Sequence, residues 1–210
     1  MTSTTKPAVV KLHRGDLPAS VAITTSVAID TETLGLKPHR DRLCLVQLST
    51  GDGTAHLVQL GAGPHNAPRL EALLTDPSIL KIFHFARFDM AVLKLHLGVD
   101  VTPVYCTKIA SKLVRTYTDR HGLKELAQEL AGVELSKQQQ SSDWGASELT
   151  QQQQAYAASD VLHLHAIKTR LDAMLAREGR TAHANACFQH LPTRIALDLA
   201  GFEDMDIFSH

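Results

Sequence analysis

The stretch VAIDTE at residues 27–32 runs three apolar, β-prone residues directly into two acids separated by one threonine. Side chains at positions i and i+2 of a strand point to the same face, so Asp30 and Glu32 would project together. A solvated strand end can have the same composition, and the pair alone therefore does not establish a site. It does predict a buried strand that ends in paired carboxylates.

Further β-prone runs surround this stretch, and the turn residues Gly51-Asp52-Gly53 separate two of them. Their spacing predicts an antiparallel meander. Further along the chain, the spacing of apolar residues becomes that of helices, with one short buried run between two helical patterns. This run and the helical patterns add a βα unit to the meander. The expected strands are at 9–13, 27–29, 43–49, 54–60 and 79–85, and helical patterns begin near 68 and 88.

The second half of the chain is predicted to be mainly helical. Thr150 and Gln153 have the spacing of a capping box, and the apolar series after them continues to Gly179, which predicts one long helix. The next helix is expected to be interrupted at Pro192. The remaining expected segments are helices at 107–116 and 123–131, a polar loop at 134–148, a helical region at 181–200 and an acidic-aromatic tail at 202–210.

Composition and charge argue against several classes of protein. Hydrophobic residues make up 44% of the 210 positions, which is typical of a compact chain rather than a disordered one. The three cysteines form no CxxC pair, which argues against a disulfide framework or a zinc ribbon. A formal charge of −1 argues against a chain that coats nucleic acid electrostatically. No segment suits a signal peptide or a membrane span, so we expect a cytoplasmic protein with no membrane partner.

Two later motifs carry acids that could converge with the first pair. In HFARFD, residues 84–89, Asp89 falls in the first turn of a predicted helix, where the helix dipole favours an acid without any function. In YAASD, residues 156–160, Tyr156 and Asp160 lie four positions apart and hence on one helix face. Each motif has a structural explanation by itself, but their occurrence together and in this order is specific.

The three motifs together resemble those of the DEDD exonuclease superfamily. Tyr156 is similar to the tyrosine of the DEDDy subgroup, and Ala155 stands where the histidine subgroup has its base. The HxxxFD run, the segments at 135–137 and 142–144 and the run YAASDV at 156–161 are similar to RNase D. The resemblance covers about residues 21–175, and the four acids it implies are Asp30, Glu32, Asp89 and Asp160.

The resemblance implies an α/β protein with the RNase H-like (DnaQ-like) exonuclease fold, in which helices flank a mixed central sheet. It implies one 3'-5' exonuclease domain over residues 1–210, with its motif-bearing core at about 21–175 and a C-terminal helical extension and tail at 181–210. RNase D continues into helical nucleic-acid-binding domains, whereas 50 residues follow Asp160 here. The chain is therefore most similar to the nano-RNase C family, which degrades short RNA and dinucleotides such as linear diguanylate. That family suggests a homo-oligomer, with an octameric ring as one form.

The resemblance also implies a chemistry for these residues. Two divalent cations about 4 Å apart, Mg²⁺ or Mn²⁺, can stabilise the attacking and leaving oxygens of a phosphodiester, and both cations prefer carboxylate oxygen. Asp30 would bridge them, Glu32 and Asp160 would bind the cation that holds the attacking water, and Asp89 would bind the other. Tyr156 would orient that water and help to activate it. The implied reaction releases nucleoside 5'-monophosphates from the 3' end of short single-stranded RNA or a dinucleotide.

Five more residues are candidate substrate contacts. Leu36 occupies the place where similar short-RNA exonucleases insert a leucine between the two terminal bases, although a turn leucine that covers the core would look the same. His84 could contact the sugar or phosphate, or could be a satisfied core histidine. Lys108, Lys112 and Arg115 recur at i, i+4 and i+7, which predicts one basic stripe. Such a stripe could dock a phosphate or could be a solvated helix face.

Two other functions stay open at this point. The same chemistry could act on DNA or on longer or structured RNA, as in RNase D-like trimming. A non-catalytic RNA-binding protein on the same fold would be expected to lack one of the acids, and all four are present. The tail alternates apolar and acidic residues from Phe202 to Phe208, and we expect it either to form an oligomer interface or to fold back on its own domain.

Overall fold

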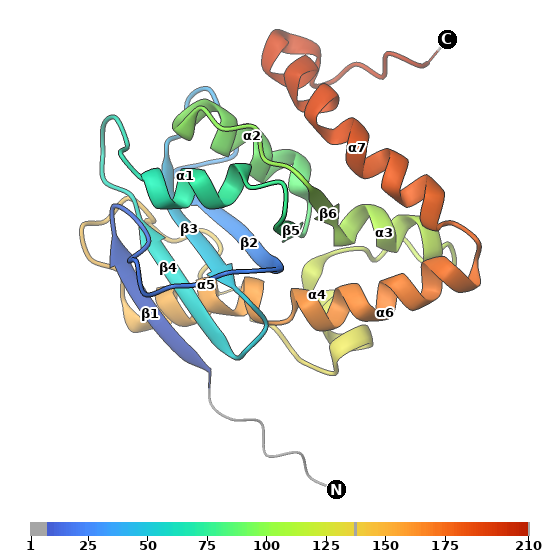
Figure 1. Ribbon diagram of the computed structural model, residues 1–210, viewed down its shortest axis with the longest axis horizontal. Helices are drawn as coiled ribbons and strands as arrows, with labels where there is room; N and C mark the ends of the chain where they lie inside the picture. The colour runs from blue at the N-terminus through green and yellow to red at the C-terminus, as the bar shows by residue number, and fades with distance from the viewer. Residues whose placement is uncertain (1–7, 137, 210) are drawn as a thin grey trace, which may run out of the picture.

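A mixed six-stranded sheet with flanking helices forms the core of the protein (Figure 1). The computed structural model describes residues 8–136 and 138–209. The strand order is β1-β4-β3-β2-β5-β6, so the strand that carries the first two acids lies inside the sheet. The strands are β1 (Val9–Arg14), β2 (Ser26–Thr33), β3 (Leu43–Ser49), β4 (Thr54–Gln59), β5 (Leu80–Phe83) and β6 (Val104–Cys106).

The antiparallel meander is confirmed for β2, β3 and β4 but is wrong for β1. Strand β3 pairs antiparallel with both β2 and β4, whereas β1 pairs parallel with β4. Parallel strands need a crossover connection rather than a tight turn. Residues 15–25, between the end of β1 and the start of β2, provide this connection. The three-residue strand β6 was not predicted, because it is too short to show an apolar period. It pairs parallel with β5 at the far edge of the sheet.

Helices cover both faces of the sheet. Figure 1 shows α1 in front of the sheet and α5 behind it. Leu45 and Leu57 of the sheet pack with Ala157 of α5 in a small apolar cluster, and the larger cluster includes the buried face of α1. The helices are α1 (Pro68–Thr75), α2 (Ala86–Leu97), α3 (Thr107–Val114), α4 (Leu123–Leu126), η1 (Ala127–Ala131), α5 (Gln151–Leu162), α6 (Leu164–Arg177), α7 (Thr181–Leu197) and η2 (Asp198–Phe202).

The prediction of one long helix after Thr150 is wrong, because the helix is broken at His163. The capping box of Thr150 and Gln153 is present and begins α5, and the chain leaves α6 just before Gly179 as expected. His163 has φ −107° and ψ −5°, outside the helical geometry of its neighbours. Helix α5 packs on β2, β3 and β4, while α6 packs on α3. Apolar residues continue through the break because both helices are buried. The apolar period of the sequence therefore does not reveal where one helix ends and the next begins.

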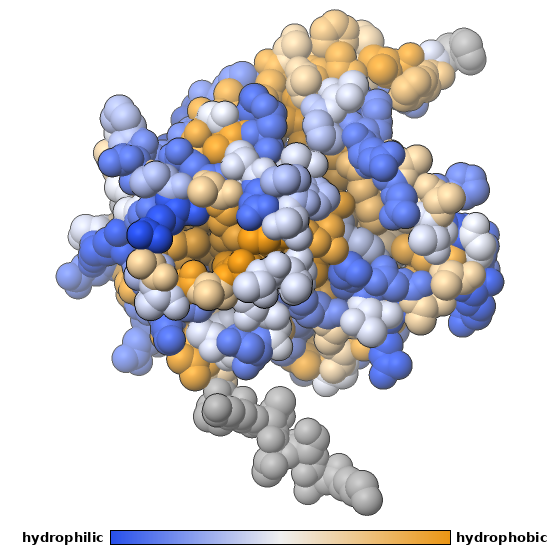
Figure 2. Space-filling view, viewed as in Figure 1, coloured by the Kyte–Doolittle hydropathy of each residue, from blue (hydrophilic) through white to orange (hydrophobic). Residues whose placement is uncertain are grey.

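The predicted interruption at Pro192 is also wrong, since α7 continues through it. A proline inside a helix costs about 3 kcal/mol. Phe188, Leu191 and Ile195 are buried on both sides of the proline, and this burial offsets the cost. The tail after α7 keeps its apolar side chains exposed, and Figure 2 shows apolar residues gathered over the upper end of the molecule, where α7 ends. Among the described residues, no helix has both the length and the apolar character to cross a bilayer.

Candidate functional site

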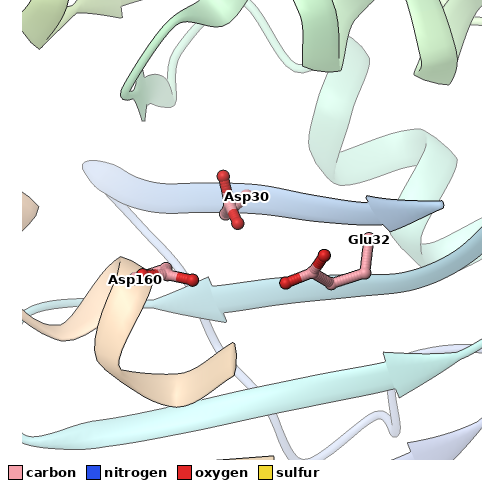
Figure 3. A group of neighbouring side chains, drawn as sticks. All are labelled: Asp30, Glu32 and Asp160. Carbon is pink, nitrogen blue, oxygen red and sulfur yellow. The ribbon is translucent and has the colours of Figure 1, made fainter. Parts of the chain in front are cut away.

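Three of the four predicted acids converge at one end of β2. Asp30 and Glu32 come from the strand and Asp160 from α5, and each offers a carboxylate oxygen within 4.8 Å of the others. Figure 3 shows the Glu32 and Asp160 side chains pointing toward each other beside Asp30. The alternation of the strand places the first two acids on one face, and the packing of α5 on β2 brings in the third.

Asp89, the fourth acid, lies beside this cluster. It is buried in the first turn of α2, as the sequence predicts. Its carboxylate does not belong to the group whose oxygens lie within 4.8 Å of one another. The hydroxyl of Thr31 donates a 2.7 Å hydrogen bond to its Oδ1. Because Thr31 separates Asp30 from Glu32 in β2, this bond ties the start of α2 to the strand that carries the first two acids.

Burial and mutual repulsion dominate the electrostatics of the cluster. Burial raises the pKa of Asp30, Glu32, Asp89 and Asp160 above their ordinary values, and the neighbouring carboxylates raise the pKa of the last three further. Within residues 8–136 and 138–209, none of these acids forms an ion pair with a lysine or arginine. A buried group of carboxylates without a positive partner is unfavourable unless a cation binds it. The oxygen donors fit a hard divalent cation such as Mg²⁺ or Mn²⁺.

Tyr156 lies one helical turn before Asp160 on α5. Its ring centroid is 6.0 Å from that of Trp144, and the side chain is half-buried. Burial raises the pKa of the phenol above its ordinary value, and the negative charge of Asp160 raises it further. The hydroxyl therefore stays protonated at neutral pH. It can position a water molecule by hydrogen bonding.

Asp30, Glu32 and Asp160 line a cavity of about 550 Å³. Leu36 and His84 line it as the sequence predicts, and Leu36 is 83% exposed. Burial and the nearby Lys108 lower the pKa of His84 to about 3, and its Nδ1 lies 2.9 Å from the hydroxyl of Thr107. His84 is thus a neutral hydrogen-bonding group at neutral pH and brings no positive charge to a phosphate.

Other residues that line the cavity were not predicted as site residues. Lys124 is the one lysine or arginine that lines it in the described part of the chain. Lys124 lies at the start of α4 and belongs to no periodic pattern or motif, so the sequence alone does not indicate that it lines the cavity. The loop before α5 also lines the cavity, through Leu135, Ser136, Gln140, Ser141, Ser142 and Trp144. Lys137, which belongs to the RNase D-like segment, lies outside the described residues.

The predicted basic stripe of Lys108, Lys112 and Arg115 is wrong. Helix α3 ends at Val114, and Arg115 is 1% exposed, with its guanidinium hydrogen-bonded to Glu129. The i+7 spacing assumed that the helix continues one residue further and that the side chain faces solvent. Lys108 and Lys112 instead line a separate apolar cavity, where the Lys108 ammonium lies 4.1 Å from the centre of the Phe85 ring. These three residues do not line the acidic cavity.

Comparison with known proteins finds similarity over most of the chain. A family model described as 3'-5' exonuclease matches residues 15–176. Ribonuclease D of Acidiphilium cryptum is 36% identical over 154 residues, which are 73% of this chain and 39% of that protein. The chain thus spans about two fifths of the length of the curated relatives it matches.

Solved structures are similar over nearly the whole chain. Brucella melitensis NrnC bound to pGG is 59% identical, with a TM-score of 0.94, and the match covers 97% of this chain and 99% of that one. Brucella melitensis NrnC with bound Mg²⁺ is 58% identical, with a TM-score of 0.92 and coverage of 96% and 99%. These similarities confirm the expected mixed α/β sheet of the RNase H-like exonuclease fold and the resemblance to nano-RNase C.

Proposed function

Because this chain belongs to the 3'-5' exonuclease family, we propose that it is a metal-dependent exoribonuclease that hydrolyses very short RNA, including dinucleotides, to nucleoside 5'-monophosphates. The observation that carries the proposal is the convergence of Asp30, Glu32 and Asp160 within 4.8 Å. We expect the protein to act in the cytoplasm, as a single exonuclease domain over residues 1–210.

The acids divide the binding of two cations between them. Asp30 would contact both, Glu32 and Asp160 would bind the cation beside the attacking water, and Asp89 would bind the other. Bound Mg²⁺ or Mn²⁺ supplies the positive charge that stabilises the attacking and leaving oxygens of an in-line displacement. The protonated hydroxyl of Tyr156 holds the attacking water, because it lies one turn from Asp160 on the same helix face.

The shape of the site supports a short substrate. Leu36 lines both the acidic cavity and a second cavity of about 540 Å³ beside it, so its exposed side chain stands between two spaces of nucleotide size. This placement suits a leucine that inserts between the two terminal bases. Similarity to an NrnC structure bound to pGG supports a dinucleotide such as linear diguanylate as substrate. Lys124 is placed to contact a substrate phosphate that the cations do not reach.

Leu36→Ala should weaken dinucleotide binding by about 1 to 3 kcal/mol, the scale of one lost base-stacking contact. Binding is measured in Ca²⁺, which occupies oxygen sites, with labelled RNAs of two to ten nucleotides. Wild-type affinity should be at least as high for two nucleotides as for ten, because a wedge between the last two bases grips only the 3' end. Leu95→Ala is the control, since Leu95 is an exposed leucine on α2 that does not line the acidic cavity.

A second candidate substrate is longer or structured RNA. It is favoured by similarity, at 27% identity and a TM-score of 0.72, to Escherichia coli RNase D, which is described as an exoribonuclease involved in structured RNA processing. Affinity that climbs steadily from two to ten nucleotides would support this alternative and reject the short-substrate proposal. If affinity does not depend on RNA length and Leu36→Ala leaves it unchanged, Leu36 does not insert between the terminal bases. The proposal of a metal-dependent exonuclease would then stand without this role for Leu36.

We also propose that the protein forms a homo-oligomer through its C-terminal tail. Arg194 and Arg87 fix the tail by donating hydrogen bonds to the carbonyls of Met205 and Glu203. The tail backbone is therefore held against α7, yet its apolar side chains stay exposed. Such a surface, fixed in place and apolar, is typical of an interface. The exposed apolar side chains are Phe202, Met205, Ile207 and Phe208, which are 40%, 56%, 43% and 73% exposed.

The double substitution Ile207→Ser and Phe208→Ser should shift the full-length protein from a closed oligomer toward smaller species in light scattering. Loss of two apolar side chains per subunit weakens every copy of the interface at once. Leu95→Ser, at an exposed leucine on α2, is the control and should leave the mass unchanged. A wild-type protein that is monomeric at all concentrations contradicts the proposal, and an unchanged oligomer in the double variant places the interface elsewhere.

A further inference from the structure

Gln47 is a fully buried polar residue next to the acidic cluster. It lies on β3 directly opposite Asp30 in the antiparallel pair with β2. Its amide nitrogen Nε2 is 3.4 Å from Oδ2 of Asp30 and 3.5 Å from Oε1 of Glu32. Its amide oxygen Oε1 has no hydrogen-bond partner in the described part of the chain. A single neutral amide thus faces two of the three converging carboxylates.

The orientation of this amide follows from electrostatics. If the amide were turned over, its oxygen would face two carboxylate oxygens, and the three negative ends would repel one another. The nitrogen therefore faces the acids and donates toward both. Because the amide carries no net charge, it restrains Asp30 and Glu32 without neutralising them. A lysine in this place would cancel the charge that a cation needs.

The packing of the strand does not explain Gln47, because its amide oxygen has no partner among the described residues and its amide nitrogen meets only the two acids. A buried carbonyl oxygen without a partner lowers the stability of a protein, and an apolar side chain of similar size would avoid this cost. The neighbours Val46 and Leu48 on the same strand are apolar and fully buried. The polar side chain at position 47 is thus explained by the two acids that its nitrogen faces.

We propose that Gln47 is a positioning residue that holds the Asp30 and Glu32 carboxylates in the arrangement that binds divalent cations. The inference rests on the proposed metal-dependent function, because it requires these acids to be ligands. Groups that hydrogen-bond to metal ligands restrict their orientation, and their loss typically weakens metal binding by about 10- to 100-fold. Gln47→Met keeps the size of the side chain and removes only the amide.

The test is calorimetric titration of Mn²⁺ into full-length protein freed of metal with EDTA. Gln47→Met should raise the Kd for Mn²⁺ at least about 10-fold. Gln59→Met is a matched control. Gln59 is also buried, on β4, and its amide oxygen is also unpartnered, but its nitrogen donates to the carbonyl of Ala146 at 2.9 Å. This control should bind Mn²⁺ with the Kd of wild type, because no ligand or ligand-orienting group is changed.

The outcomes separate this inference from the proposed function. Wild-type protein that binds no Mn²⁺ rejects both. Wild-type binding with an unchanged Kd in Gln47→Met rejects the positioning role and leaves the proposed function standing. Excess Mn²⁺ should restore the turnover of Gln47→Met toward wild type, which a folding defect would not allow. If Gln47→Met does not fold, Gln47→Asn applies the same test, because its shorter amide keeps the polarity but moves away from both acids.

Discussion

Asp30→Asn should lower turnover of a dinucleotide by at least about 10³-fold, the scale reached when charge stabilisation is removed from a reaction centre. Asn keeps the shape of the side chain and loses the charge of the ligand proposed to contact both cations. Asp30 lies within 4.8 Å of Glu32 and Asp160, so its loss also leaves only two converging carboxylates. Turnover is measured by release of mononucleotide in saturating Mg²⁺.

The same variant should be more stable than wild type when metal is absent. Burial raises the pKa of Asp30 to about 7, so the folded state takes up a proton more readily than the unfolded chain. The associated stability is present below the ordinary pKa of an aspartate, near 4, and is lost as the pH rises through about 7. At pH 8 the metal-free wild type carries this penalty and the variant does not.

Thermal unfolding in EDTA at pH 8 measures this difference, and added Mg²⁺ should stabilise only the wild type. Asp100→Asn is the control, since Asp100 is 74% exposed and pairs with Lys94 on the surface. It should change neither turnover nor the response to Mg²⁺. Retention of a tenth of wild-type turnover in Asp30→Asn would exclude Asp30 as a ligand on which the reaction depends.

Tyr156→Phe should lower the single-turnover rate on a bound dinucleotide by at least about 10²-fold, the lower end of what a positioned proton donor or acceptor contributes. The ring can still pack beside Trp144, so only the hydroxyl is lost. Mn²⁺ affinity should stay within about twofold of wild type, because the phenol is not one of the carboxylates that the cations prefer.

Tyr105→Phe is a matched control for this experiment. Tyr105 is buried, its ring packs on Phe188, and it does not line the acidic cavity. It should leave both the rate and Mn²⁺ affinity unchanged. An equal rate in Tyr156→Phe and wild type would make Tyr156 a structural residue.

The strand and the faces on which its acids lie could be predicted from short-range patterns. Alternation along β2 places Asp30 and Glu32 on one face, and the i, i+4 spacing in α5 places Tyr156 beside Asp160. These relations depend only on the periods of a strand and a helix. The resemblance of the three motifs then predicted which of these elements meet, which no local period could show.

The errors have a common physical cause, which is that tertiary packing overrides local pattern. The break at His163 turns α6 onto α3 although the apolar series continues. Burial on both sides of Pro192 keeps α7 intact. Arg115 pairs with Glu129, so a spacing that predicts a surface stripe instead gives a buried arginine side chain with an exposed carboxylate partner. In each case the deciding partner lies on another element.

The cavity lining was harder to predict for the same reason. Lys124 and Trp144 reach the site from α4 and from the loop before α5, and neither belongs to a repeating pattern. Gln47 lies between the apolar residues Val46 and Leu48, and its importance is evident only from its register opposite Asp30. Contacts of this kind, made by loops or between neighbouring strands, can be identified only once the fold is known.

The most direct test of the proposed function is a time course with 5'-labelled GG dinucleotide and full-length protein in Mg²⁺, in Mn²⁺ and in EDTA. We predict complete conversion to labelled mononucleotide with either cation, none in EDTA, and none with Asp30→Asn under the same conditions. A folded wild-type protein that leaves the dinucleotide intact in both cations, or that cleaves it equally well in EDTA, would contradict the account.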